Sequence, residues 1–95
     1  MMVNTFGRFV KDPQAKLDYA INWSQWLNSD GDTISASTWS TESGITIETD
    51  SKTDSIATVW LSGGEAGRSY KVTNHIVTQG GRENEFSIVI VVQQR

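Results

Sequence analysis

The chain contains no cysteine and only one proline among its 95 residues. Without cysteine no disulfide can cross-link the chain, and thiolate chemistry and zinc–thiolate sites are excluded. The absence fits assembly in a reducing compartment such as the cytosol. A single proline agrees with a chain made largely of strands, because proline removes a backbone donor from a sheet.

The sequence also lacks a basic stripe, a long apolar run and an apolar leader. Eight basic and eleven acidic residues give a net charge of −3, so nucleic acid is not an expected partner. The longest apolar run, residues 88–92, is far shorter than the ~20 residues that a membrane span needs. Residues 1–9 have no apolar core of a signal peptide. We therefore expect a soluble protein made in the cytoplasm, with no membrane partner.

The length fits one domain with a thin core. A chain of this size buries roughly 60–68% of the surface that its unfolded form exposes. Four tryptophans are present, and each can bury about 150–250 Å². Residues 1–8 show no core pattern, so we predict a flexible N-terminal arm there and a single domain over residues 9–95.

Short strand patterns fill the predicted domain. Apolar and polar residues alternate at 17–23, 45–49, 70–78 and 86–92, while 33–41 and 56–61 are rich in β-branched and aromatic residues, and residues 9–10 begin a short strand. Turn signals recur about every 8–12 residues, which predicts an all-β, immunoglobulin-like β-sandwich of about seven antiparallel strands. A helix over residues 14–27 is the alternative, but its apolar positions do not share a helical face.

The last predicted strand is apolar on both faces. Phe86, Ile88 and Ile90 alternate with Val89 and Val91. A strand with one solvated face would carry polar residues there. We therefore expect another subunit or the N-terminal arm to cover its outer face.

A glycine-rich turn at residues 63–67 precedes a strand that opens on Tyr70. This arrangement is similar to the tyrosine corner of sandwich folds, in which the hydroxyl bonds to upstream backbone. Antibody domains carry a cysteine two residues later, where this chain has Val72. The turn is not a phosphate loop, because it lacks the Gly-Lys-Ser/Thr ending and a strand follows it.

Three features suggest chemistry, and each has a simpler explanation. His75 is the only histidine, and no nucleophile-elbow motif surrounds any serine, so we expect a surface or interface histidine. The sequence Asp30-Gly31-Asp32 partly matches a calcium loop, but a polar turn explains it. Asn22 begins a glycosylation sequon that has no secretory signal beside it. We predict no catalytic, cofactor-binding or metal-binding residue.

The tryptophans allow two interpretations. Trp23 and Trp60 lie on predicted strand faces, and we expect them to fill the core, while Tyr70 has a structural role. All four, including Trp39, would otherwise line a carbohydrate groove. Trp26 borders a turn, where it is either a lid on the sandwich or an exposed anchor for a partner.

Two blocks of the sequence resemble one family. The first block contains Lys11-Asp12-Pro13, Leu17-Asp18-Tyr19 and Trp23-Ser24 with Trp26-Leu27. The second, more specific block reads Thr58-Val59-Trp60-Leu61-Ser62-Gly63-Gly64, followed by Ala66-Gly67, Tyr70 and Val72-Thr73-Asn74. Both blocks resemble small tailed-phage structural proteins of the fiber-tail adaptor, or Gp77-like, family. The resemblance covers nearly the whole chain after Val10.

The resemblance implies an immunoglobulin-like virion protein at the neck, tail or fiber attachment. We therefore predict a non-enzymatic bacteriophage adaptor that is assembled in the host cytoplasm. Its partners would be other phage structural proteins, with a homo-oligomer in the virion as an option. The candidate interface lies in the arm, at Trp26 and in the tip at residues 79–84, and comprises Phe6, Arg8, Trp26, Gln79, Arg82 and Asn84. The alternatives are a capsid decoration protein and a carbohydrate-binding module for host glycans.

Overall fold

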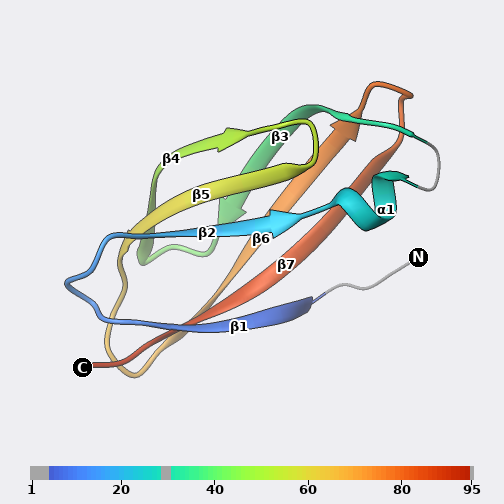
Figure 1. Cartoon of the computed structure of the whole chain (residues 1–95). Coiled ribbons are helices and arrows are strands. Elements are labelled where there is room, and N and C mark those ends of the chain that lie inside the picture. Colours follow the sequence, from blue (N-terminus) through green and yellow to red (C-terminus); the bar gives the residue numbers. More distant parts are fainter. Residues whose placement is uncertain (1–4, 29–30, 95) are drawn as a thin grey trace.

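A computed structural model describes residues 5–28 and 31–94, and most of them lie in strands (Figure 1). The elements are β1 (Thr5–Lys11), β2 (Leu17–Asn22), α1 (Ser24–Asn28), β3 (Ile34–Thr41), β4 (Ile45–Lys52), β5 (Ile56–Gly63), β6 (Ser69–Thr78) and β7 (Glu83–Val92). One sheet has the order β1-β7-β6-β3, and the other has the order β2-β5-β4. The two sheets face each other, which confirms the predicted all-β sandwich.

The core forms where alternate residues of both sheets point inward. In β5 these residues are Ala57, Val59 and Leu61, and all three are fully buried. Because side chains alternate across a strand, Trp60 must face outward, and 39% of it is exposed. The prediction that Trp60 fills the core was therefore wrong, whereas Trp23 is 6% exposed and belongs to the core cluster.

β1 begins four residues before the predicted domain start. Residues 5–8, expected in an arm, form the first part of this strand, and residues 1–4 lie outside the described residues. β1 pairs with β7 in parallel, with Phe9 opposite Ile90 and Lys11 opposite Val92. The other strand pairs are antiparallel, as predicted. β1 thus pairs with the edge of β7. That another subunit or the N-terminal arm covers the outer face of β7 stays a prediction.

The short helix α1 follows β2 directly. The side-chain oxygen of Asn22 accepts a 2.9 Å hydrogen bond from the N–H of Ser24, an Asx turn that leads into the helix. Leu27 is 1% exposed and anchors the helix in the core. From the sequence, the residues around Trp26 were expected to link a strand to a turn, whereas they form this helix. The described part of the chain has no helix able to cross a membrane.

Two polar contacts tie the sheets together at the end away from α1. The amino group of Lys11 donates to the carbonyl of Gly63 at 2.6 Å, joining β1 to β5, and burial lowers the pKa of Lys11. The hydroxyl of Tyr70 accepts a 3.0 Å hydrogen bond from the backbone N–H of Glu65, the type of bond that a tyrosine corner makes. Gly44 lies under the Tyr70 ring, where a Cβ would approach to 2.9 Å.

Candidate docking site

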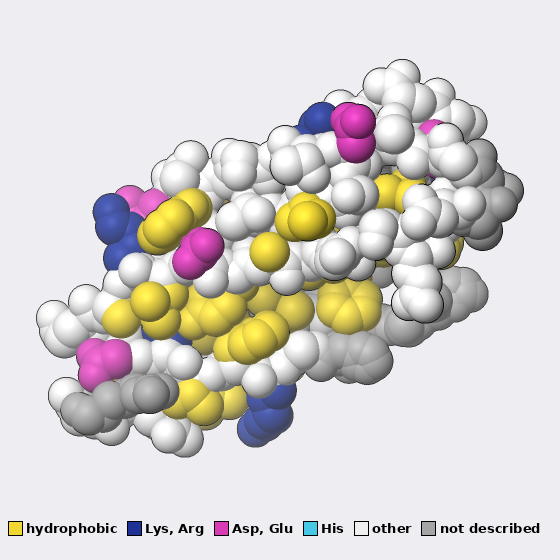
Figure 2. All heavy atoms as spheres, in the orientation of Figure 1, with side chains coloured by type: hydrophobic (Ala, Val, Ile, Leu, Met, Phe, Trp, Pro, Cys, Tyr) yellow, Lys and Arg dark blue, Asp and Glu magenta, His cyan; other side chains and the backbone are white. Residues whose placement is uncertain are grey.

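The two long sides of the sandwich differ. On one side the edge strands β3 and β4 contact each other and close the sandwich. On the other side a groove of about 720 Å³ lies between the β1–β7 pair and β2. Figure 2 shows hydrophobic side chains gathered in a band along this side, between β1 and β2. This groove is the candidate docking site.

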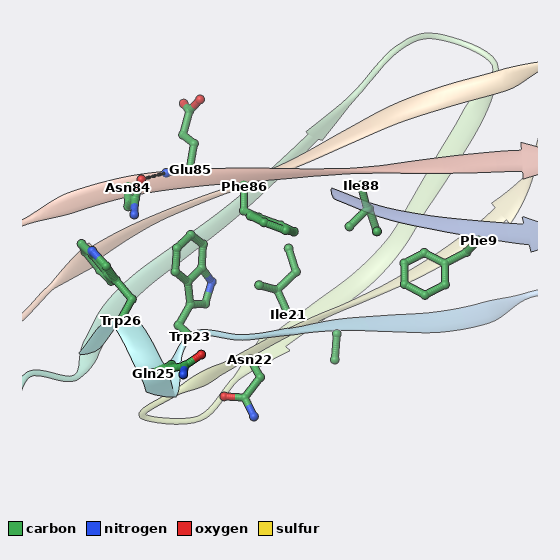
Figure 3. A pocket seen from close by; sticks show the side chains of 12 residues that line it. Phe9, Ile21, Asn22, Trp23, Gln25, Trp26, Asn84, Glu85, Phe86 and Ile88 are labelled. Atoms are coloured by element: carbon green, nitrogen blue, oxygen red, sulfur yellow. Dashed lines mark hydrogen bonds between the residues drawn. The ribbon is translucent and has the colours of Figure 1, made fainter. Parts of the chain in front are cut away.

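The interior of the groove is apolar. Its apolar lining includes Phe9, Ile21, Trp23, Trp26, Phe86 and Ile88. Figure 3 shows side chains from β1, β2 and β7 directed into the space between the two layers. Gly7 also lines it, and a Cβ there would lie 2.8 Å from the Phe9 ring. The glycine therefore leaves room for the Phe9 ring at the wall of the groove.

The aromatic rings brace one another. The Trp23 ring packs edge-on against Trp26, with centroids 5.7 Å apart, and against Phe86 at 6.2 Å. The Phe9 ring lies 5.2 Å from Tyr19, which joins β1 to β2 across the groove. Such tilted and edge-on pairs are favourable beyond the area that they bury. The groove therefore has a preorganised wall.

Trp26 is held at one end of the groove. The guanidinium of Arg82 lies 4.3 Å above the Trp26 ring. Arg82 also pairs with Asp32, with 3.3 Å between Nε and Oδ2. Oδ1 of Asp32 accepts hydrogen bonds from the backbone N–H groups of Thr33 at 2.9 Å and Gly80 at 3.0 Å. The tip between β6 and β7 is thus clamped to the loop before β3.

These contacts give a structural role to Asp32, which belongs to the segment that the sequence predicted to be a polar turn. A hydrogen bond from the Thr78 hydroxyl, and others from Thr33, Gly80 and Arg82, hold the pKa of Asp32 below its usual value, although desolvation opposes them. Within residues 5–28 and 31–94 no group of three His, Cys, Asp or Glu residues could hold a metal ion. Asp30 lies outside the described residues.

Several polar residues that line the groove make hydrogen bonds within the protein. The side-chain oxygen of Asn84 accepts a 2.9 Å bond from the N–H of Glu85, as Asn22 does from Ser24. The carboxylate of Glu85 points away from the groove (Figure 3). It accepts from His75 at 3.1 Å on the outer face of the sheet. Apart from the amides of Asn22, Gln25 and Asn84, the described lining therefore presents apolar side chains and no charge to an occupant.

His75 lies on that outer face, between two carboxylates. Its ring nitrogens are 3.1 Å from Glu85 and 2.9 Å from Glu83, and 36% of its side chain is exposed. The hydrogen bond to Glu85 and then that to Glu83 raise the pKa of His75, against partial burial. The position is that of a surface histidine.

The structure brings together half of the predicted interface. Trp26, Arg82 and Asn84 meet at one end of the groove. Arg8 is exposed on β1, and Gln79 is exposed in the tip, where its N–H donates to the Thr33 carbonyl at 2.9 Å. Phe6 lies in β1, and its side chain is outside the described residues.

Sequence analysis missed the other walls of the groove. Phe9, Ile21, Phe86 and Ile88 come from three strands that are distant in sequence. One signal was present, because adjacent Phe9 and Val10 make the first strand apolar on both faces. To place Phe9 at the groove, one must know that β1 pairs with β7. The alternation of apolar and polar residues does not specify this pairing.

These features define a small immunoglobulin-like sandwich with an apolar groove along one open side. The chain belongs to the family described as podophage GP4 fiber-tail adaptor protein gp77, which matches residues 11–91. This match confirms the resemblance to tailed-phage structural proteins. None of the curated proteins matches the chain.

The fold is similar to that of a solved structure. That structure is the 2,6-sialyltransferase of Photobacterium sp. JT-ISH-224, with a TM-score of 0.61 and 12% sequence identity. The alignment covers 96% of this chain and 18% of the sialyltransferase chain. At this identity the likeness concerns the sandwich fold alone.

Proposed function

We propose that this protein is a non-enzymatic virion component that joins a fiber to the tail of a podophage-like particle. Its partners are other phage structural proteins, and assembly takes place in the host cytoplasm. The family match over residues 11–91 supports a location at the tail of the particle. The observation that carries a joining role is the apolar groove of about 720 Å³ along the open side of the sandwich.

The mechanism is geometric. A contiguous apolar surface on a small protein marks a place where a partner binds. The braced aromatic rings of Trp23, Trp26 and Phe86 give that surface a fixed shape, so little ordering is needed on binding. Repeated copies in a symmetric particle would add avidity to each modest contact.

The alternative of a glycan-binding groove has weaker support. Sugar binding by tryptophan uses an open aromatic face, whereas Arg82 covers a face of Trp26. The oxygens of Asn22 and Asn84 already accept backbone hydrogen bonds. The family match to a tail protein likewise favours the tail over the capsid exterior.

Two side chains of equal exposure provide the test. Phe9 is 38% exposed at the groove, and Trp60 is 39% exposed on the outer face of the other sheet. Phages carrying Phe9→Ser should assemble particles that lack fibers, whereas Trp60→Ser particles should keep them. Virion protein composition and electron microscopy measure the outcome, and thermal unfolding verifies that both variants fold. Normal fibers on Phe9→Ser particles would refute the groove as the joining site.

A further inference from the structure

β1 is the edge strand of its sheet and borders the groove. We propose that an extended segment of a partner phage protein adds to the sheet beside β1 and inserts alternate apolar side chains into the groove. This inference rests on the proposed joining function and specifies how the partner is held.

The direction of the β1 backbone supports strand addition. The carbonyl of Lys11 accepts a 3.0 Å hydrogen bond from the N–H of Gln93, so the polar groups of Lys11 point toward the β7 side. Successive residues of a strand direct these groups to opposite sides. The backbone N–H and carbonyl groups of Phe9 therefore also point toward β7. Those of Arg8 and Val10 point to the open edge. Such a row of groups is a template for another strand.

Of the other edge strands, β2 borders the groove opposite β1, while β3 and β4 lie on the closed side of the sandwich. The β4 edge carries the charged residues Glu48, Asp50 and Lys52, a common protection against strand addition. β3 and β4 also contact each other.

β1 has a register shift between Thr5 and Gly7, and past it the described side chains from Arg8 to Lys11 carry only one exposed charge. Phe9 and Val10 are 38% and 42% exposed, on opposite faces of the strand. Arg8 is its one exposed charge among the described side chains, because Lys11 is fully buried. An edge that is apolar on both faces and lies beside an open groove fits a strand, since a strand satisfies backbone groups and fills the groove together.

The charges indicate which kind of strand fits. Residues of an added strand alternate between the groove and the outer face, where they meet Arg8 and Val10. An acidic residue opposite Arg8 and an apolar residue opposite Val10 would make favourable cross-strand pairs. A second copy of β1 offers no such match, because the strand has no acidic residue to lie opposite Arg8. The inferred occupant is therefore a segment of a different protein, apolar on its groove face and acidic beside Arg8.

Val10 allows a selective test of the backbone contact. Val10→Pro removes an N–H that points to the open edge, where proline is tolerated, and leaves the β1–β7 hydrogen bonds in place. Val10→Thr is the matched control, because it keeps the N–H and the β-branched shape. The purified fiber and tail proteins of the same phage serve as probes. We expect Val10→Pro to weaken binding about tenfold or more, the equivalent of about 1.4 kcal/mol, while Val10→Thr binds nearly as wild type.

Hydrogen exchange on the wild-type protein gives an independent readout. The amides of Arg8 and Val10 should exchange rapidly in the free protein and become protected in the complex. If a complex forms while these amides stay unprotected, or if Val10→Pro binds normally, strand addition is wrong and the joining function stands. If the wild-type protein binds neither probe, the proposed function itself fails. Protection that grows with the concentration of this protein alone would assign the edge to a second copy and overturn the inference.

Discussion

The indole N–H of Trp23 donates a 2.9 Å hydrogen bond to the side-chain oxygen of Asn74, across the interior of the sandwich. Asn74 is fully buried, and its amide nitrogen donates to the hydroxyl of Ser37 at 2.9 Å and to the carbonyl of Thr38 at 3.1 Å. One amide thus connects the start of α1 with β6 and β3. It also orients the Trp23 ring, which forms a wall of the groove.

Trp23→Phe should reveal the value of this bond. The substitution leaves the buried oxygen of Asn74 without its donor, a loss of about 1–3 kcal/mol in the free energy of unfolding, and opens a cavity that adds to the loss. Urea denaturation followed by circular dichroism measures the change. The control is Trp60→Phe on the outer face, which should shift the free energy by no more than about 0.5 kcal/mol. Equal losses in both variants would show that the cross-sheet bond contributes little.

The two tryptophans also show what alternation alone can predict. The period of two identified β5 and put Trp60 on the face opposite Val59 and Leu61, but it does not say which face is buried. The small aliphatic residues fill the core, and the large ring stays outside. The helix α1 has five residues, too few for a helical period to be visible in the sequence.

The candidate site was predictable only in part. Trp26, Arg82 and Asn84 were chosen because they lie in or near turns, and they do meet at one end of the groove. The apolar walls at Phe9 and Ile21 required the parallel pairing of β1 with β7, which brings the first and last strands of the chain together. Long-range pairing of this kind has no local sequence signal.

Tyr70→Phe should weaken the turn that precedes β6. The substitution removes the hydroxyl that accepts from the Glu65 N–H at 3.0 Å and keeps the buried ring, which is 4% exposed. We expect the free energy of unfolding to fall by about 0.5–1.5 kcal/mol, the net value of one hydrogen bond. Urea denaturation is the measurement, together with faster hydrogen exchange at Glu65. Unchanged exchange at Glu65 would contradict a structural role for the hydroxyl.

His75 should make stability depend on pH near neutrality. Its pKa in the folded protein is raised from 6.5, mainly by the hydrogen bond to Glu85 and also by that to Glu83. A raised pKa means that the folded state holds the proton more tightly than the unfolded state. The stabilisation is therefore complete below pH 6.5 and is lost as pH rises through the folded-state pKa.

Unfolding by urea at a series of pH values tests this dependence. The wild-type free energy of unfolding should decline across that window. His75→Gln should remove the decline, because glutamine fills a similar space and carries no titratable group. A wild-type curve that stays flat, or a variant with the same decline, would assign the dependence to other groups.

Asp32→Asn should release the tip between β6 and β7 from the loop before β3. The amide keeps the size of the side chain but loses the charge that attracts Arg82, and its oxygen is a weaker, neutral acceptor for the N–H of Gly80, now 3.0 Å from Oδ1. The pKa of Asp32 is lowered from 3.8, first by the Thr78 hydroxyl, so its stabilisation is present above pH 3.8 and is lost as pH falls through the lowered value.

The acid limb of the unfolding curve measures this contribution. Wild-type stability should fall more steeply than that of Asp32→Asn as pH drops below 3.8, so the two curves converge in acid. Asp50→Asn, an exposed carboxylate on β4, is the control and should run parallel to wild type. Freed from the clamp, Arg82 should also leave the Trp26 ring, and the exchange of the Gly80 amide should accelerate. Identical acid limbs for wild type and Asp32→Asn would mean that the clamp does not contribute to folding.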